Sequence, residues 1–192
     1  MPDPNPSALE FLLNRRSRPA KTLSGPAPDR AELGPILAAA ARCPDHGKLE
    51  PWRFVVLERP ALERLAELAA TRGAEAGLED VQIDKGVGQF AQSPLAIVVI
   101  AAPVEHPKVP WIEQILSSGA VCLGLLNAAL ASGWGANWLT GWVAHDRPFA
   151  EAAYGLKEGE IVAGIIHVGT ENSAPPERPR PDISAITTWI DA

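Results

Sequence analysis

The stretch PLAIVVIAAP, residues 94–103, restricts the fold of this chain more than any other segment. It contains no polar side chain and is rich in β-branched residues. A strand with one face in water alternates apolar and polar residues, whereas a strand covered on both faces is apolar throughout. The run therefore predicts a β-strand buried on both faces. Strands are also predicted within segments 52–58, 133–141 and 160–170, which are aromatic or β-branched.

Helices are predicted between these strands. Two begin with the spacing of a capping box, Ser7 with Glu10 and Asp29 with Glu32, in which side chain and backbone satisfy each other's free groups. Leucine and alanine at three- and four-residue spacing predict another helix after Pro60. Segment 78–90 is ambiguous, because two glycines weaken its helical pattern.

The longest helix is expected from Trp111 to about residue 132, with Gly133 as its stop signal. It lies in the longest apolar stretch of the chain, which serines and an asparagine interrupt. These polar side chains favour a buried core helix over a membrane span. A short helix should follow, with Asp146 as its cap and Gly155 at its end.

Composition limits the function further. The 192 residues suit one domain, 1–192, and a net charge of −6 argues against nucleic-acid binding as the main role. The chain has two cysteines, and its first residues lack a basic start and an apolar signal core, which together predict a cytoplasmic, reduced protein. The Pro-rich tail, about residues 171–192, cannot fold on itself and must be disordered or held by another surface.

The cluster NRRSR, residues 14–18, ends the first predicted helix. Arg15 and Arg16 can present guanidinium groups, and Ser17 a hydroxyl, to phosphate or carboxylate oxygens. Basic residues are also common at helix C-termini, where they complement the helix dipole. The residues alone leave both interpretations open.

The loop CPDHGKLEPWRF, residues 43–54, poses a similar choice. Cys43 and His46 are both metal-ligand types, but the other histidines and Cys122 are scattered without ligand spacing, so no metal site is predicted. The second interpretation is a turn that grips a planar ligand. Neither a dinucleotide-binding glycine fingerprint, nor a phosphate-binding Walker loop, nor a hydrolase nucleophile elbow is present in the sequence. No side chain is predicted to be a catalytic acid or base.

Five segments in order resemble the flavin-dependent nitroreductase family, and the resemblance is closest to its short bacterial NAD(P)H nitroreductase subgroup. They are RRSR, ARCPDHGKLEPWRFVVLE, HPKVPWIEQ, GWGANWLTG and IVAGIIHVGT, and the resemblance runs from about Ala8 to Thr170. It implies an α+β nitroreductase-like fold, a mixed β-sheet flanked by helices, in an intertwined homodimer. It also implies FMN bound at the subunit interface, with NAD(P)H as the electron donor.

The resemblance assigns expected roles to residues of this chain. Arg15, Arg16 and Ser17 would hold the FMN phosphate, while Arg42 and His46 would reach the flavin bound mainly by the other subunit. The turn Trp138, Leu139, Thr140 and Gly141 would lie at the reactive edge of the flavin. A dinucleotide role is implied for Ala128, Ala129, Leu130, Ala131, Ser132 and Gly133. Relatives carry an arginine where Leu139 stands, and the missing charge could come from Arg18 or Lys21.

The expected function is NAD(P)H-dependent, FMN-mediated reduction of a nitroaromatic, a quinone or a similar electron-poor small molecule. Two alternatives stay open at this point. One is a flavin oxidoreductase for a specific metabolite. The other is a protein that binds or senses flavin without turnover. Neither nucleic acid nor membrane is an expected partner.

Overall fold

Strand β3 (Leu95–Ala101) lies inside the sheet, between β5 (Ile161–Glu171) and β2 (Trp52–Leu57), and all its residues are buried. The computed structural model describes residues 3–191. In these residues the sheet has five strands in the order β1-β5-β3-β2, and β4 also pairs with β5. The two remaining strands are β1 (Leu23–Ser24) and β4 (Gly135–Leu139). The predicted strand that is buried on both faces is confirmed.

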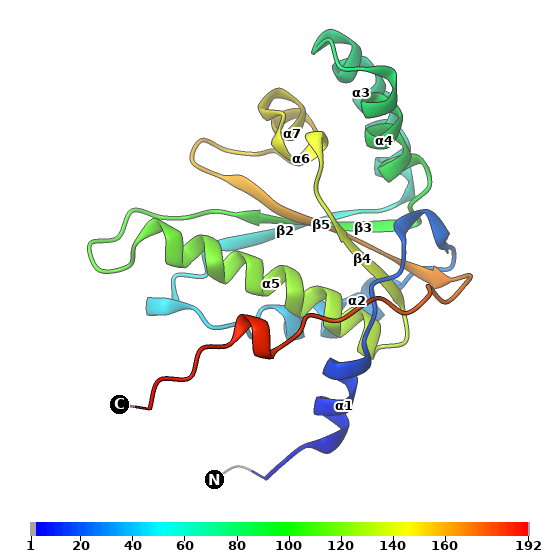
Figure 1. The fold of residues 1–192 in the computed structure, drawn as a ribbon. Coiled ribbons are helices and arrows are strands. Elements are labelled where there is room, and N and C mark those ends of the chain that lie inside the picture. Colours follow the sequence, from blue (N-terminus) through cyan, green and yellow to red (C-terminus); the bar gives the residue numbers. More distant parts are fainter. Residues whose placement is uncertain (1–2, 192) are drawn as a thin grey trace.

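Helices cover both faces of this sheet, as Figure 1 shows. Helices α2 (Arg30–Ala40) and α5 (Trp111–Ala131) lie against one face. The other face carries α3 (Arg59–Glu75), α4 (Asp80–Ala91), α6 (Trp142–His145) and α7 (Arg147–Tyr154). Helix α1 (Pro6–Asn14) projects from the α5 side. The expected α+β class with helices on both faces is confirmed.

Alternate residues of β3 build two separate cores. Ala96, Val98 and Ile100 pack with α3, α4 and α7, whereas Leu95, Ile97 and Val99 pack with α2 and α5. Successive side chains of a strand point to opposite faces of the sheet. A strand whose two faces are both covered by helices therefore needs apolar residues at every position. Helix α5 is long and apolar enough to span a membrane, yet Val121, Cys122 and Leu125 on it are fully buried in the second core.

The expectation of a mixed sheet needs a correction. All four strand pairings among residues 3–191 are antiparallel. The strands β3 and β4 run in the same direction and are joined by the long connection through α5, but each pairs with β5 and they do not pair with each other. Within the described part of one chain, the sheet is therefore antiparallel and not mixed.

Local capping signals were mostly interpreted correctly. Asp29 caps α2 in a complete capping box, and Asp146 caps α7, which ends at the left-handed Gly155. The cap expected at Ser7 is wrong, because Asn5 accepts the backbone N–H of Ala8 and α1 begins one residue before Ser7. The ambiguous segment 78–90 forms most of helix α4, which continues to Ala91.

Candidate functional site

The segment Arg15–Arg18 lies beside β4. The backbone N–H of Arg18 donates to the Ala136 carbonyl at 2.8 Å, and the Asn137 side-chain amide donates to the Arg18 carbonyl at 2.8 Å. These two bonds hold the chain that follows α1 against the strand that leads into the predicted turn 138–141. The fold thus brings together two of the predicted site segments, which are more than a hundred residues apart in the sequence.

The C-terminal tail returns to the same place. The Nη2 atom of Arg16 donates a hydrogen bond to the Pro176 carbonyl oxygen at 2.8 Å. A cavity of about 610 Å³ opens between the two segments and is lined by Arg15, Arg16, Ser17, Arg178, Pro179, Arg180 and Pro181. Arg178 and Arg180 are candidate site residues that the sequence interpretation missed. The signal that could have found them is the alternation of arginine and proline in the tail.

The arginine cluster is arranged to receive an anion. Burial, followed by the neighbouring charges of Arg180, Arg16 and Arg18, lowers the pKa of Arg15. The Nε atoms of Arg15 and Arg16 are buried and have no hydrogen-bond partner. Unpaired buried donors and crowded like charges both destabilise a protein, and a negatively charged ligand relieves both.

Arg15 and Arg16 differ in what they already bind. Arg15 makes one side-chain hydrogen bond, from Nη2 to the hydroxyl of Ser17 at 3.1 Å. Arg16 holds the tail through Pro176. Arg15 and Ser17 therefore form a hydrogen-bonded pair in the wall of the cavity, while Arg16 also anchors the tail.

The turn after β4 faces helix α4. Leu139, Lys85 and Gln89 line two adjoining cavities of about 550 and 430 Å³. The Gln89 side-chain amide donates to the Thr140 carbonyl at 3.0 Å, which ties the turn to α4. Gly141 has φ of 91°, and a Cβ there would lie 3.2 Å from the Gln89 Nε2 atom. Glycine thus lets the turn pass close to α4.

Trp138 contributes to this turn mainly through its backbone. Its side chain packs against the second core, and a Cβ on Gly164 would lie 2.1 Å from its Nε1 atom. Strand geometry explains this, because neighbouring residues of β4 point to opposite faces. Asn137 and Leu139 line the larger cavity, and Trp138 points away from it.

Relatives carry an arginine at the position of Leu139, and Arg18 was one candidate to replace its positive charge. The guanidinium of Arg18 is already engaged in other bonds. Its Nε donates to Glu171 at 2.6 Å and its Nη1 to the Arg16 carbonyl at 2.9 Å. Lys21, the other candidate, lines the same cavity as Leu139. Lys85 on α4 lines it as well and was not expected from the sequence.

His46 lies far from this site within one chain, whereas Arg42 follows α2, whose last residue Ala40 lies against Gly124 of α5. The Nδ1 of His46 is 2.5 Å from an oxygen of Glu113, in the first turn of α5. Leu130, near the other end of α5, lines a cavity with Arg15 and Arg16. At 1.5 Å per residue, these two ends of α5 are about 25 Å apart. A single subunit does not bring His46 to the arginine cluster.

The loop that carries His46 has an unusual backbone. Lys48 and Glu50 have positive φ values of 54° and 48°, and Gly47 has 77°. Residues other than glycine rarely adopt a positive φ. The few that do are concentrated at functional sites. The Asp45 carboxylate accepts the Glu50 N–H at 2.7 Å and helps to hold the turn. Cys43 packs against Ser117, with its sulfur 3.7 Å from the carbonyl oxygen.

The segment expected to have a dinucleotide role forms the end of α5. Ala129 is fully buried, whereas Leu130 and Gly133 line a cavity of about 340 Å³ together with Arg15, Arg16 and Arg18. The remaining residues of the segment, Ala128, Ala131 and Ser132, are not part of that lining. Over residues 3–191, no group of three or more His, Cys, Asp or Glu side chains could hold a metal ion.

Comparison with known proteins identifies the family. The model of the nitroreductase family matches residues 12–170. The chain belongs to the nitroreductase family. It is 37% identical over 163 residues to the provisionally named NAD(P)H nitroreductase YdjA of Escherichia coli K12, which covers 85% of this chain and 87% of that protein.

Two solved structures have the same fold as this nitroreductase-family protein. One is a nitroreductase-like protein from Bacillus cereus, with a TM-score of 0.76 and 24% identity over the whole of both chains. The other is a nitroreductase from Bacteroides fragilis with bound FMN, with a TM-score of 0.74 and 20% identity, covering 97% of this chain and 100% of that one. The nitroreductase-like fold expected from the five sequence motifs is confirmed.

Proposed function

We propose that this protein is an FMN-dependent oxidoreductase that uses NAD(P)H to reduce nitroaromatics, quinones or similar electron-poor acceptors. The observation that carries the proposal is the cavity in which Arg15, Ser17 and the tail arginines meet. Membership of the nitroreductase family supports it. So do the NAD(P)H in the name of the Escherichia coli relative and the FMN bound to the Bacteroides fragilis protein.

The residues of the site fit FMN. Its terminal phosphate matches a cavity with two buried, unpaired arginine Nε atoms, Arg15 and Arg16, and with Arg178 and Arg180 in its wall. Its ring system matches the adjoining cavities beside Leu139, whose volumes of about 550 and 430 Å³ are typical of small-molecule sites. The chain runs directly from the arginines to Pro19, Ala20 and Lys21 in the wall of the larger cavity.

The residues of this chain would bind and orient the cofactor. Bound FMN supplies the redox chemistry, and the protein sets its position and electrostatic surroundings. Arg15 and Ser17 would hold the phosphate, and Arg16 would keep the tail arginines beside it. The backbone of Trp138, Leu139 and Thr140 would approach the ring, with the bend at Gly141 behind it. No side chain is assigned as a catalytic acid or base.

The proposal includes a homodimer with FMN between its subunits. His46 can contact a flavin held by the arginine cluster only from another subunit, because about 25 Å of α5 separates the two within one chain. Arg42, which precedes the same loop, would approach the flavin with it. The wall of a dimer site would then combine the arginine cluster of one subunit with the strained His46 loop of its partner.

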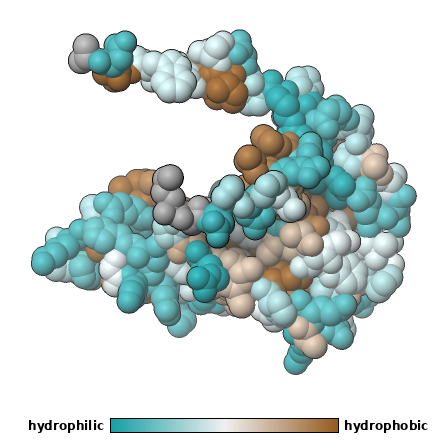
Figure 2. Space-filling model, turned by 90° about the horizontal axis from the view of Figure 1, so that it is seen from below, coloured by the Kyte–Doolittle hydropathy of each residue, from teal (hydrophilic) through white to brown (hydrophobic). Residues whose placement is uncertain are grey.

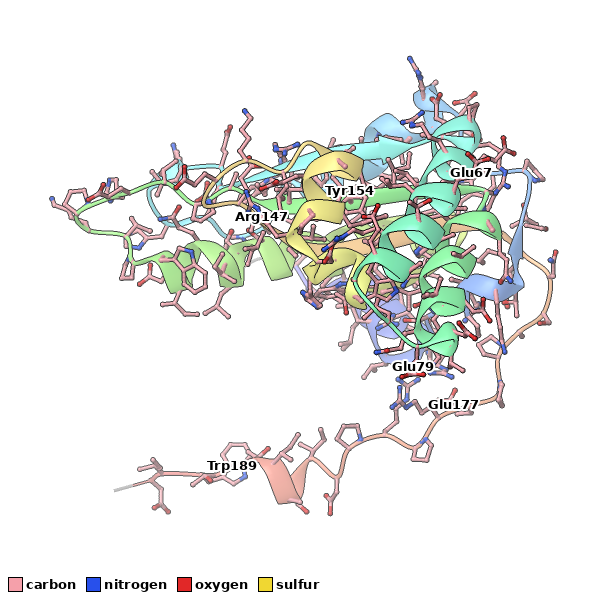
Figure 3. All side chains as sticks on the ribbon, turned by 90° about the horizontal axis from the view of Figure 1, so that it is seen from above. Glu67, Glu79, Arg147, Tyr154, Glu177 and Trp189 are labelled. Atoms are coloured by element: carbon pink, nitrogen blue, oxygen red, sulfur yellow. The ribbon has the colours of Figure 1, made fainter. Side chains whose placement is uncertain are left out.

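Exposed apolar side chains also support a dimer. Helix α1 has no buried residue, and its leucines Leu9, Leu12 and Leu13 are 56–64% exposed. Ile112, Leu116 and Leu123 form an exposed apolar row on α5. In the projecting tail, Trp189 is 89% exposed and stands away from the body of the molecule in Figure 3. Figure 2 shows apolar side chains on both the body and this arm. Apolar surface of this extent usually marks a protein interface.

The dinucleotide role of residues 128–133 and the cytoplasmic location belong to the same proposal. Leu130 and Gly133, beside the arginine cluster, are the members of the segment that a bound ligand could reach. Their cavity lies next to the proposed phosphate site, where Arg15 and Arg16 line both.

One series of measurements tests the function. The purified protein should be yellow, and heat should release FMN, identified by chromatography. Anaerobic addition of NADH or NADPH should bleach the flavin, and a nitroaromatic or quinone should restore its colour. Finding FAD, or no flavin after reconstitution, would refute the cofactor. Reduction without reoxidation by any acceptor would identify a flavin-binding protein and refute the enzyme.

Sedimentation tests the dimer. The subunits should remain associated on dilution, and dissociation should coincide with unfolding and loss of FMN, since intertwined dimers often have no stable monomer. A folded monomer that retains FMN would contradict the shared site.

A further inference from the structure

Gln89 on α4 has one hydrogen-bonding atom in use and one without a partner. Its Nε2 donates to the Thr140 carbonyl at 3.0 Å. Because a carbonyl can only accept, this bond fixes which end of the amide faces the turn. The other end, Oε1, is buried and unpaired. Gln89 lines both cavities beside Leu139, and its Oε1 is buried next to them.

We propose that Gln89 accepts a hydrogen bond from the N3–H of the flavin pyrimidine ring. The inference rests on the proposed function and adds a residue that reads one particular edge of the cofactor. That edge has an N–H donor between two carbonyl oxygens. It therefore needs one acceptor flanked by donors, and an amide oxygen beside lysines offers this combination.

The charges around Gln89 agree with this assignment. Lys21 and Lys85 line the larger cavity and can donate to the flanking carbonyl oxygens. Leu139 carries no positive charge, and the guanidinium of Arg18 is paired with Glu171. The ammonium groups of Lys21 and Lys85 would therefore supply the positive charge at this edge of the flavin. Asp84 lines the cavity too, and its carboxylate can only accept. Of the polar groups in this wall, the Gln89 oxygen is the buried acceptor without a partner.

An unpaired buried acceptor is the physical reason to expect a donor there. Leaving a carbonyl oxygen without a hydrogen bond destabilises a protein, and native structures satisfy nearly all such groups. A small shift of the Gln89 side chain toward either cavity, with the Thr140 bond kept, would let a ligand N–H reach Oε1. The ligand N–H would then give the Gln89 Oε1 atom the hydrogen-bond partner that it lacks within the protein.

The test compares FMN with N3-methyl-FMN, which lacks the N3–H donor. Apo-protein should bind the methylated cofactor about 3- to 10-fold more weakly than FMN, the effect of one hydrogen bond. Gln89→Met has similar length and no acceptor, so it should bind the two cofactors with nearly equal affinity. Gln92→Met is the matched control, because Gln92 lines the same cavity without an unpaired buried atom, and it should discriminate like the parent.

A second readout needs no variant and no analogue. With ¹⁵N-labelled FMN bound to the parent protein, the N3 proton should appear in the NMR spectrum, protected from exchange and shifted as in a hydrogen bond. An N3 proton that exchanges freely overturns the inference. So does unchanged discrimination in Gln89→Met. In both cases tight FMN binding that depends on Arg15 would leave the proposed function intact, whereas failure of the parent to bind FMN would remove both.

Discussion

Replacing Arg15 by alanine should weaken FMN binding by about one to two orders of magnitude. Its guanidinium makes one side-chain hydrogen bond, to Ser17, and its Nε is buried without a partner. Charge-assisted hydrogen bonds of the kind it can make to phosphate contribute about 1.5 to 3 kcal/mol. At about 1.4 kcal/mol per factor of ten, this predicts the stated loss. Arg16→Ala should act through the tail, because its Nη2 holds Pro176.

The assay is a fluorescence titration of apo-protein with FMN and, in parallel, with riboflavin. Riboflavin has the same ring and side chain without the phosphate, so Arg15→Ala should hardly change its affinity. Arg64→Ala serves as a charge-matched control, since Arg64 lines a different cavity between α2 and α3. Equal losses for FMN and riboflavin, or a variant that binds FMN like the parent, would refute the phosphate site.

The free energy of unfolding of Arg15→Ala provides a second, independent test of the role of Arg15. Burial and the charges of Arg180, Arg16 and Arg18 lower the pKa of Arg15, so its charged form is disfavoured in the protein without ligand. Apo Arg15→Ala should therefore resist urea at least as well as the parent while binding FMN worse. A clear loss of stability would mean that Arg15 supports the fold and not the ligand.

Three further predictions concern other parts of the molecule. His46→Ala should alter the spectrum or the potential of bound FMN with a smaller loss of affinity than Arg15→Ala; an unchanged flavin would remove His46 from the site. Leu116→Asp, on the exposed face of α5, should dissociate the dimer and release FMN together, as sedimentation and flavin fluorescence can show; a stable FMN-bound dimer would place the interface elsewhere. Burial lowers the pKa of His167 to about 4, so as the pH falls below about 6.5 the unfolded chain takes up the proton first. The free energy of unfolding should thus drop by about 2 kcal/mol between pH 8 and pH 5, and urea titrations of His167→Gln should lack this drop.

Much of the fold can be predicted from short segments. The apolar run ending at Ala101 required cover on both faces, and α2 and α5 on one side with α3, α4 and α7 on the other provide it. The caps at Asp29 and Asp146 were readable because a capping bond joins residues two or three positions apart. The order of five motifs was enough to indicate the family, and the match over residues 12–170 bears this out.

The predicted site was partly readable for the same reason. Arg15, Arg16 and Ser17 are consecutive, so anion binding is one of the two interpretations that the sequence itself offers for them. The sequence could not show which arginine remains available. Arg16 is held by Pro176, 160 positions away, and Arg18 by Glu171, 153 positions away. Pairings at such distances depend on how the whole chain packs.

Three features of the protein therefore came from the amino-acid sequence and three from the tertiary structure. The sequence by itself determined a sheet strand buried on both faces, a basic segment after the first helix and a glycine turn after β4. These follow from periodicity, charge and backbone freedom within a few neighbouring residues. Only the tertiary structure decided that the tail arginines join Arg15, that Gln89 faces the turn at Thr140, and that His46 lies at the far end of α5. Each of these depends on contacts between segments that come together only when two helical layers close over the sheet.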